Sequence, residues 1–488
     1  MNFSPIPAIL KDFSKPFRAN GFEVYAVGGA VRDFCLGKKN SDFDFATDAD
    51  PDDVKRLFPK VIPTGIKHGT VTVLFKGEMF EVTTFRTENG YVDCRHPDSV
   101  EFVSSLEEDL KRRDFTINAL AVKIPDPKII DLHGGLLDLK NHLIRCIGVP
   151  HDRFMEDALR MMRACRFASQ LGFDIEGSTF DAICELKDNI KFVSLERIQE
   201  ELSKIIMSDN PRKGIESLSR SGLLDLILPE LAACRLVQQL GYHHEDVYYH
   251  SLSTLDAAAS RDWSLEVRLA ALLHDIGKPS CQEKAENRYT FYNHDIAGAK
   301  MTKELLKRLK YPNSVIDKVA TLVRNHMFNY TPDWTDGAVR RFVLRCGKDN
   351  VDDVLRLRLA DQLAMSGNCI NPNVDQLESR IKAIESPSLT VNDLALTGDD
   401  LKAMGLKPGP VFSEIKEFLL QQVLDRPELN TKEQLSQIAQ KYISNRHGKP
   451  LFARLINSVS LKLITPSNTS RALCQSDPNY ARYAICRF

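Results

Sequence analysis

The sequence predicts an α+β protein in which a small mixed β-sheet head precedes a predominantly helical remainder. Over residues 1–125, short runs rich in Val, Phe and Thr alternate with turn-forming residues, as they do in strands. From about Asp152 onward, apolar residues recur every three or four positions, which is the period of an amphipathic helix. A chain of 488 residues also exceeds what one hydrophobic core accommodates, so we expect roughly three or more compact domains.

The composition narrows the class of protein. Of the residues, 43% are hydrophobic and 27% are charged, which excludes a disordered or collagen-like chain. No apolar run approaches the roughly 20 residues that cross a bilayer. Residues 1–17 lack the cationic and apolar regions of a secretory signal. We therefore expect a cytoplasmic protein with no membrane partner.

Charge and cysteine content are less specific. The 65 Lys and Arg residues balance 66 Asp and Glu residues, which argues against a protein that coats nucleic acid over its whole surface but allows a local basic groove. The 11 cysteines form no C-x-x-C pair, which favours reduced structural thiols. The sequence does not indicate an oligomeric state.

The expected elements follow from these patterns in chain order. In the head, strands are expected at residues 22–27, 42–46, 71–75, 79–85 and 120–124, and helices at 31–36 and 51–58. Beyond the head, two helical faces stand out: Leu159, Met162 and Phe167 form one, and Leu195, Ile198, Leu202 and Ile205 form the other.

The first candidate site is a glycine pair between a strand and a helix. Gly28 and Gly29 follow the first expected strand, and paired glycines let the backbone approach a ligand closely. The helix start would present N–H groups to an anion, and Arg32 lies one turn further on. The segment is therefore a candidate phosphate loop.

The next strand carries two acidic residues. Successive side chains of a strand point to opposite faces, so Asp42 and Asp44 project together while Phe43 and Phe45 enter the core. Two carboxylates on one face repel each other, and a divalent cation relieves the repulsion. Oxygen ligands favour Mg²⁺, which completes its coordination with nucleotide phosphates. Glu81, on a later strand, offers a third carboxylate.

With these motifs the chain resembles the nucleotidyltransferase superfamily, and specifically the bacterial CCA-adding tRNA nucleotidyltransferases, which share a head with bacterial poly(A) polymerase. The resemblance extends through further motifs in the family's order. They are residues 65–71 (GIKHGTV), the flexible loop 86–95, the ribose and triphosphate motif 112–119 (RRDFTINA), the hinge motif 131–138 and the base-reading motif 156–160 (EDALR).

The resemblance implies phosphoryl transfer with Mg²⁺ held by Asp42 and Asp44. One ion would activate the tRNA 3′-hydroxyl for attack on the α-phosphate, and the other would steady the departing pyrophosphate. CTP and ATP would be the substrates and tRNA the partner, with two cytidines and then one adenosine added.

The arginines of the matching motifs suit these substrates. Arg112 and Arg113 offer forked donors to a triphosphate, and Asn118 can bond a ribose hydroxyl. Asp157 and Arg160 are three apart on an expected helix and would share a face.

A carboxylate beside a guanidinium matches the amine-plus-acceptor edge of cytosine and adenine. Guanine and uracil would instead present a carbonyl to Asp157. Arg163 and Arg166 continue the face of Arg160 and could bind the phosphates or the RNA end.

The middle of the chain resembles the HD phosphohydrolase superfamily. His250, the pair His274-Asp275 and the distant Asp361 match its metal-binding set, and His294 and His326 could hold a second metal. Mixed imidazole and carboxylate ligands suit Ni, Co, Mn, Fe or Zn. The resemblance implies removal of phosphates or opening of 2′,3′-cyclic ends as a side activity.

Together the patterns divide the chain into five parts. They are a head (residues 1–150), a helical neck that binds nucleotide bases and RNA (151–240), an HD domain (241–385), a helical tRNA-binding tail (386–448) and an extension (449–488) that we expect to be poorly ordered.

Several alternatives stay open. The GIKHGTV loop and the near-neutral charge disfavour poly(A) polymerase, and the loop at 86–95 disfavours an enzyme that adds only CC. No short motif separates an enzyme that adds only A. In other classes, the chain would be chiefly an HD phosphohydrolase with a non-catalytic RNA-binding head, or a non-catalytic tRNA-binding protein.

Overall fold

The computed structural model describes residues 3–38, 42–66, 69–91, 97–102, 105–239, 245–285, 288–366, 372–384 and 390–446. The chain forms two compact units. Unit 1 comprises Met1–Thr331 and Cys346–Glu378, and unit 2 comprises Pro332–Arg345 and Ser379–Phe488. The extension predicted at residues 449–488 lies outside the described residues.

A seven-stranded mixed sheet forms the head, which confirms the predicted α+β architecture. Its strands, in spatial order, are β3 (Val61–Gly65), β4 (Thr70–Phe75), β5 (Glu78–Thr84), β2 (Asp44–Thr47), β1 (Val24–Val27), β8 (Leu120–Lys123) and β9 (Ile129–Asp131). β2 and β5 are parallel, whereas the other neighbouring strands are antiparallel.

The five strands expected in the head are all present, with ends that differ by a few residues. The expected helices correspond to α2 (Gly29–Cys35) and α3 (Pro51–Leu57). The sequence reading missed β3, β9, the hairpin of β6 (Arg86–Tyr91) and β7 (Pro97–Phe102), and the first helix, α1 (Ala8–Ala19).

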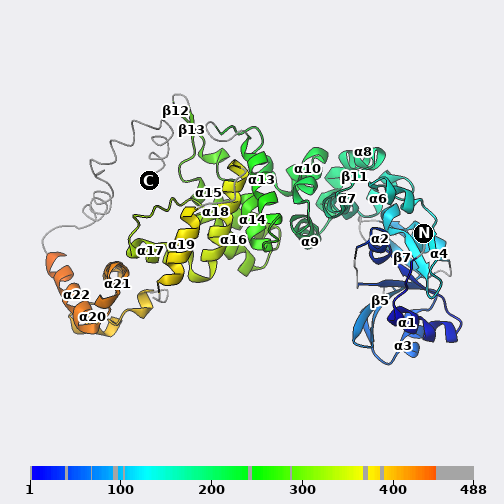
Figure 1. Cartoon of the computed structure of the whole chain (residues 1–488), viewed down its shortest axis with the longest axis horizontal. Helices are drawn as coiled ribbons and strands as arrows, with labels where there is room; N and C mark the ends of the chain where they lie inside the picture. The colour runs from blue at the N-terminus through cyan, green and yellow to red at the C-terminus, as the bar shows by residue number, and fades with distance from the viewer. Residues whose placement is uncertain are drawn as a thin grey trace. The chain divides into compact units, whose positions relative to one another are not determined.

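Helices α1 and α3 cover one face of the sheet (Figure 1). α1 is amphipathic, and its Leu10, Phe13 and Phe17 are fully buried. The Phe13 ring contacts five other aromatic rings: Phe17, Phe45, Phe58, Phe75 and Phe80. α3 begins at a capping box formed by Asp50 and Asp53, with proline in its first turn.

The other face of the sheet packs against the segment that follows the hairpin. Here α4 (Leu106–Lys111) contributes Leu110 to a core with Tyr25, Val27 and Ala46. Because side chains alternate along a strand, Asp44 projects to the same face as Ala46, two residues further on. Glu81 is the register partner of Asp44 on β5 and therefore shares that face.

Short elements and a series of helices follow the sheet. They are α5 (Gly135–Lys140), β10 (Leu143–Ile144), α6 (Pro150–Glu156), α7 (Leu159–Leu171), β11 (Asp174–Ile175), α8 (Gly177–Leu186), α9 (Leu195–Ile206), α10 (Pro211–Ser221), α11 (Leu223–Ile227) and α12 (Pro229–Ala232). The predicted face of α9 is buried at Ile198, Leu202 and Ile205.

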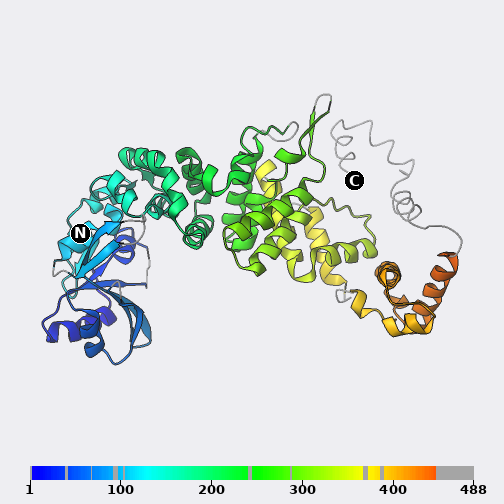
Figure 2. The same ribbon diagram turned by 180° about the vertical axis from the view of Figure 1, so that it is seen from behind.

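The last part of unit 1 is a helical body, coloured green to yellow in Figure 2. It contains α13 (Val247–Ala259), α14 (Leu265–Leu273), α15 (His294–Arg308), α16 (Asn313–Asn325), α18 (Val351–Ser366) and α19 (Pro372–Ala383), with a hairpin of β12 (Glu283–Ala285) and β13 (Arg288–Thr290). α13 packs on α14 and α18, and α14 packs on α16. α19 crosses the boundary between the units.

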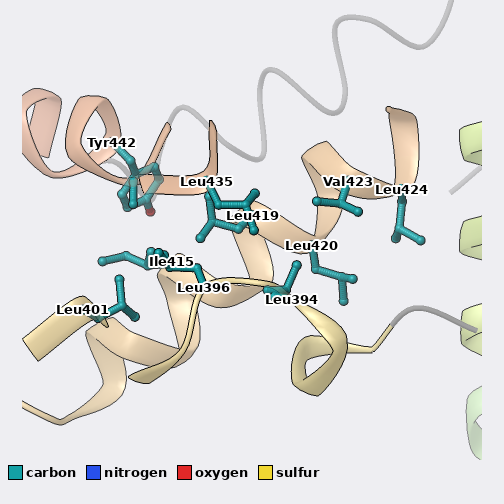
Figure 3. Close-up of a cluster of buried hydrophobic side chains, with 11 residues drawn as sticks. Leu394, Leu396, Leu401, Ile415, Leu419, Leu420, Val423, Leu424, Leu435 and Tyr442 are labelled. Carbon is teal, nitrogen blue, oxygen red and sulfur yellow. The ribbon is translucent and has the colours of Figure 1, made fainter. Parts of the chain in front are cut away.

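Unit 2 contains α17 (Asp336–Cys346) except for its last residue, and α20 (Gly398–Ala403), α21 (Pro410–Asp425) and α22 (Lys432–Arg446). Figure 3 shows its core, in which Leu401, Leu419 and Leu435 are fully buried. α17 falls within the range predicted for the HD domain, yet Leu344 packs on this core and Arg341 pairs with Asp425 at 2.9 Å. These contacts place residues 332–345 in unit 2.

Across the described ranges, no helix is both long enough and apolar enough to cross a membrane.

Replacing Phe13 with Ala is expected to destabilise the head by about 3–5 kcal/mol, because it leaves a cavity among the surrounding rings. The midpoint of urea unfolding measures the effect. Met79→Ala on β5 is the control: Met79 is 67% exposed, and its loss should change stability by less than about 0.5 kcal/mol. Equal shifts for the two variants would contradict the packing role of Phe13.

Candidate functional site

The three predicted carboxylates of the head gather on one face of the sheet. Asp44 is the first residue of β2, and Glu81 is its register partner on β5. Asp42 lies two residues before Asp44. Desolvation, then repulsion by Glu81 and Asp42, raises the pKa of Asp44 to about 6, and the nearby Arg113 opposes the shift. Carboxylates that repel one another in this way fit a divalent cation with oxygen ligands.

The glycine loop at Gly28 lies close to Arg113, which belongs to the ribose and triphosphate motif. Gly28 has a φ of 72°, and a β-carbon there would lie 3.2 Å from the Arg113 guanidinium. A side chain at this position would therefore be strained and crowded. The Arg113 Nε is buried, and no hydrogen-bond partner for it occurs in the described parts of the chain. The described residues therefore leave one hydrogen-bond donor of Arg113 unsatisfied.

Buried Asp114 links the ribose motif to α7. One of its oxygens accepts from the Asn118 amide at 3.1 Å, and the other accepts from the Arg163 guanidinium at 2.5 and 2.8 Å. The Asn118 amide oxygen accepts from Arg32 at 2.7 Å. Burial raises the pKa of Asp114, but the charge of Arg163 and the Asn118 hydrogen bond outweigh it and hold the pKa at about 2.

An aromatic ring lies among the arginines of this network. The guanidinium carbons of Arg32, Arg163 and Arg166 lie 5.2, 5.6 and 4.4 Å from the centroid of the Phe167 ring. Arg166 also pairs with Glu201 of α9 at 2.9 Å. Burial and the nearby Arg163 charge lower the pKa of Arg166 to about 10.

The Asp109 carboxylate, which was not predicted as a site residue, orients both Arg112 and Arg113. Asp109 on α4 is buried and binds Arg112 at 2.7 Å and Arg113 at 3.3 Å. Burial raises the pKa of Asp109, but the two arginines together lower it. The spacing of three and four residues along a helix is the signal that could have identified this residue.

The base-reading motif differs from the expected single helix. α6 ends at Glu156 and α7 begins at Leu159, so Asp157 lies between two helices in an extended conformation. The expectation that Asp157 and Arg160 share a face of one helix is therefore wrong. The backbone turns at Asp157 because its side chain accepts from the Leu159 N–H at 3.1 Å, as in an Asx turn.

Asp157 and Arg160 are each held by other residues. Arg160 pairs with Glu156 at 2.6 Å and donates to the Arg112 carbonyl at 3.1 Å. Asp157 pairs with Arg197 of α9 at 2.8 Å. No sequence signal identified Arg197, because it lies forty positions away along the chain.

A second cluster lies in the helical body of unit 1. It consists of His250, His274, Asp275, His294, His326 and Asp361, all of which are buried. The ligand atoms of His250, His274 and Asp275 lie within 4.8 Å of one another, as do those of Asp275, His294 and His326. Asp361 Oδ1 lies 3.1 Å from His250 Nε2. The structure thus brings together all six predicted residues, with Asp275 shared by two groups.

Backbone carbonyls orient three of the four imidazoles. The Nδ1 atoms of His274, His294 and His326 lie 2.7–2.9 Å from the carbonyls of Ala271, Phe291 and Val323, and a neutral ring that donates from Nδ1 carries its lone pair on Nε2. His274 Nε2 and His294 Nε2 then face oxygens of Asp275 at 3.2 and 3.3 Å.

A cation stabilises these approaches. It can be a proton, because the charge of Asp275 and its hydrogen bond outweigh burial and raise the pKa of His274, or it can be a bound metal ion. Within the described residues His294 Nε2 has no hydrogen-bond partner. Burial and the neighbouring His274 lower the pKa of His326 to about 3, which keeps this imidazole neutral. Imidazole nitrogens that converge on a buried carboxylate fit a transition metal.

The charged residues that contact this cluster were not predicted from the sequence. Lys278 lies 2.6 Å from Asp275 Oδ2 and donates to Gln239, and Arg358 donates to Asp361 at 2.8 Å. Lys278 and Arg358 lie three positions from the acids they contact, a spacing that could have identified them.

Two predicted motifs fall partly outside the described residues. In the loop at 65–71, Lys67 and His68 are not described. In the loop at 86–95, the backbone is described as far as residue 91, where it belongs to β6.

Three protein families match successive parts of the chain. Residues 24–145 match the Poly A polymerase head domain, residues 172–235 match the probable RNA and SrmB-binding site of polymerase A, and residues 247–366 match the HD domain.

Curated relatives and solved structures extend these matches. The CCA-adding enzyme of Enterococcus faecalis is 35% identical over 448 residues, which cover 90% of this chain and 98% of that protein. A shorter match to the Lactobacillus helveticus CCA-adding enzyme, at 46% identity over 271 residues, spans 55% of this chain and 65% of that protein. The crystal structure of the Bacillus stearothermophilus CCA-adding enzyme in complex with CTP is 30% identical and covers 90% of this chain and 98% of its own, with a TM-score of 0.69.

The resemblance seen in the motifs is confirmed by a relative aligned over nearly its whole length, and the chain belongs to the family of CCA-adding enzymes.

Proposed function

We propose that the chain adds the CCA end to tRNA 3′ termini from CTP and ATP without a nucleic-acid template. Membership of the CCA-adding family supports this reaction. The observation that carries the proposal is the grouping of Asp44, Glu81 and Arg113 beside the Gly28 loop. In the proposed reaction the tRNA 3′-oxygen attacks the α-phosphate, a phosphodiester forms and pyrophosphate leaves.

Asp42, Asp44 and Glu81 would hold the Mg²⁺ ions. When bound, Mg²⁺ activates the attacking hydroxyl and neutralises charge on the departing phosphates. Arg112 and Arg113 would bind the triphosphate, with Asp109 keeping both guanidinium groups in place.

Asn118 would recognise the ribose. Arg32 and Asp114 bind opposite ends of its amide group, so the amide plane is fixed before a nucleotide arrives. A fixed amide can hydrogen-bond a 2′-hydroxyl without losing further side-chain freedom. Arg163 would lie close to the same nucleotide because Asp114 also binds it.

Asp157 and Arg160 would select the base. Asp157 accepts from an exocyclic amine, and Arg160 donates to a ring nitrogen or carbonyl. Cytosine and adenine offer both complementary groups, whereas uracil and guanine present a carbonyl to the carboxylate. A buried polar group without its partner costs about 1–3 kcal/mol, which is sufficient for discrimination.

A second function is favoured by the cluster around Asp275. The inward imidazole nitrogens of His274, His294 and His326 support metal-dependent hydrolysis of phosphate esters at this site. A bound metal would supply a polarised water as the nucleophile. Ni, Co, Mn, Fe and Zn all suit these ligands.

Nucleotide incorporation on three tRNA substrates tests the first function. The substrates end before CCA, after the first C and after CC, and each is incubated with CTP, ATP or both. We expect completion of CCA followed by a stop. ATP addition only after CC would identify an A-adding enzyme, and continued ATP addition would identify a poly(A) polymerase.

Asp42→Ala is expected to reduce incorporation by at least about a thousandfold, because it removes a metal ligand. Asp52→Ala, an exposed aspartate on α3, is the matched control and should leave incorporation unchanged. Unchanged incorporation by Asp42→Ala would rule out the proposed mechanism.

Asp44→Asn is expected to raise the melting temperature at pH 8 in EDTA. The pKa of Asp44 rises from 3.8 to about 6 on folding, so the wild type loses stability as the pH rises through this interval. The gain from Asp44→Asn should be complete above pH 6 and absent below about pH 4. Mg²⁺ should stabilise the wild type more than the variant, and equal stabilisation would contradict the site.

His274→Ala is expected to remove tightly bound transition metal from the cluster around Asp275, as measured by elemental analysis after dialysis. His151→Ala, at an exposed histidine, should retain the metal. Hydrolysis of p-nitrophenyl phosphate should fall with the metal content. Full hydrolysis by the double variant His274→Ala, Asp275→Ala would exclude this cluster as a hydrolytic site.

A further inference from the structure

A buried glutamine lies next to the cluster around Asp275. Gln239 is 6% exposed and lies in the segment between α12 and α13. Its side-chain oxygen accepts from the Lys278 ammonium, which lies 2.6 Å from Asp275 Oδ2. The same segment is held to the start of α13, because the Val237 carbonyl accepts from the Val247 N–H at 3.0 Å. Gln239 is therefore separated from the cluster by a single lysine side chain.

The lysine determines which way the Gln239 amide faces. An ammonium group only donates hydrogen bonds, so the amide atom that meets Lys278 must be the oxygen. The amide nitrogen then faces away from Lys278, and it is buried without a hydrogen-bond partner among the residues that the structure describes. Buried donors are nearly always paired, so the two N–H groups of this nitrogen point to a ligand that accepts from them.

The surroundings of the amide favour an anionic ligand. Lys278 has three N–H groups, of which Asp275 and Gln239 use two. The Lys278 nitrogen also lies 5.6 Å from the centroid of the Phe291 ring, which holds it from another side. Amide donors beside metal-binding residues match the oxygens of a phosphate group, because metal ions bind some of these oxygens and N–H groups bind the rest.

We propose that the Gln239 amide binds an oxygen of a terminal phosphate at the cluster around Asp275, and so makes the site selective for phosphate monoesters over phosphate diesters. The proposal rests on the metal-dependent hydrolysis proposed above and names the substrate class of that site. Lys278 acts through Gln239, because it holds the amide in the orientation that presents both N–H groups.

The selectivity follows from the number of phosphate oxygens. A monoester has three oxygens outside its ester bond, whereas a diester has only two outside its ester bonds. The histidines and aspartates of the cluster form two groups that share Asp275, and metal ions held there would take two oxygens. A monoester then has a third, charged oxygen that accepts from Gln239. A diester has an organic group in that place, which leaves the buried amide without a partner.

Binding of inorganic phosphate to the Mn²⁺-loaded protein, followed by isothermal titration calorimetry, tests the inference. Gln239→Glu keeps an oxygen for Lys278 but replaces the N–H groups with a second oxygen, so the dissociation constant should rise at least roughly tenfold. Gln239→Met removes both polar atoms and should also weaken binding, and it provides the test if Gln239→Glu does not fold. Gln238→Glu is the matched control: the neighbouring Gln238 is exposed, and its replacement should leave phosphate affinity unchanged.

Two further measurements separate this role from other effects on the site. Elemental analysis should find the same metal content in Gln239→Glu as in the wild type, because Gln239 is not a metal ligand. The double variant His274→Ala, Asp275→Ala gives the phosphate that binds elsewhere in the chain, and this amount is subtracted. A loss of affinity that only follows a loss of metal would overturn the inference, and so would unchanged affinity in both Gln239 variants.

Hydrolysis of two model esters tests the selectivity. Gln239→Glu should lower kcat/KM for p-nitrophenyl phosphate, a monoester, by roughly tenfold. It should leave kcat/KM for bis(p-nitrophenyl) phosphate, a diester, nearly unchanged. Equal losses on the two esters would overturn the inference.

The phosphate titration separates this inference from the proposed hydrolysis, because binding requires no turnover. A wild type that binds phosphate at the cluster but hydrolyses neither ester would refute the proposed hydrolysis alone. A wild type that hydrolyses the monoester, with phosphate affinity unchanged in both Gln239 variants, would refute the role of Gln239 alone.

Discussion

The nucleotide site depends on the hydrogen bond and the ion pair that the buried Asp114 carboxylate makes. Asp114 lies in the segment that leads back into the sheet, and it binds Asn118 of the same segment and Arg163 of α7. A buried carboxylate is stable only with such partners, so the segment around Asp114 and helix α7 must keep this arrangement together. Removing one partner would leave an uncompensated charge, which is far costlier than losing a surface ion pair.

The cluster around Asp275 also centres on a buried carboxylate, but its neighbours are mainly imidazoles. There, backbone carbonyls at the ends of α14 and α16 and before α15 hold the Nδ1 sides of the imidazoles, so that the Nε2 atoms converge on Asp275. Lys278 supplies one cation at 2.6 Å. In both sites, groups outside the reacting set decide which atoms of the reacting set are available. The two sites therefore differ in ligands but share a design in which orientation is fixed before binding.

The sequence predicted what depends on local pattern. The alternation of side chains in residues 42–46 correctly predicted that Phe43 and Phe45 are buried. The parallel pairing of β2 with β5 places Glu81 beside Asp44. Contacts between distant segments could not be predicted in this way, because Arg197 and Asp157 are joined only by the packing of α9. The break between α6 and α7 at Asp157 was not predicted, because apolar residues recur at helical spacing both before it, at Phe154, and after it, at Leu159. The nucleotide roles of the site residues stay predictions.

The arginines of the site are paired with carboxylates. Arg112 and Arg113 share Asp109, while Arg160, Arg163, Arg166 and Arg197 pair with Glu156, Asp114, Glu201 and Asp157. Each carboxylate reduces the net positive field of the site but fixes the direction of a guanidinium fork. A site built on excess charge would attract any polyanion, whereas oriented forks bind phosphates and bases only in one geometry. Because the guanidinium groups of this site are paired, its selectivity depends on their orientation more than on excess positive charge.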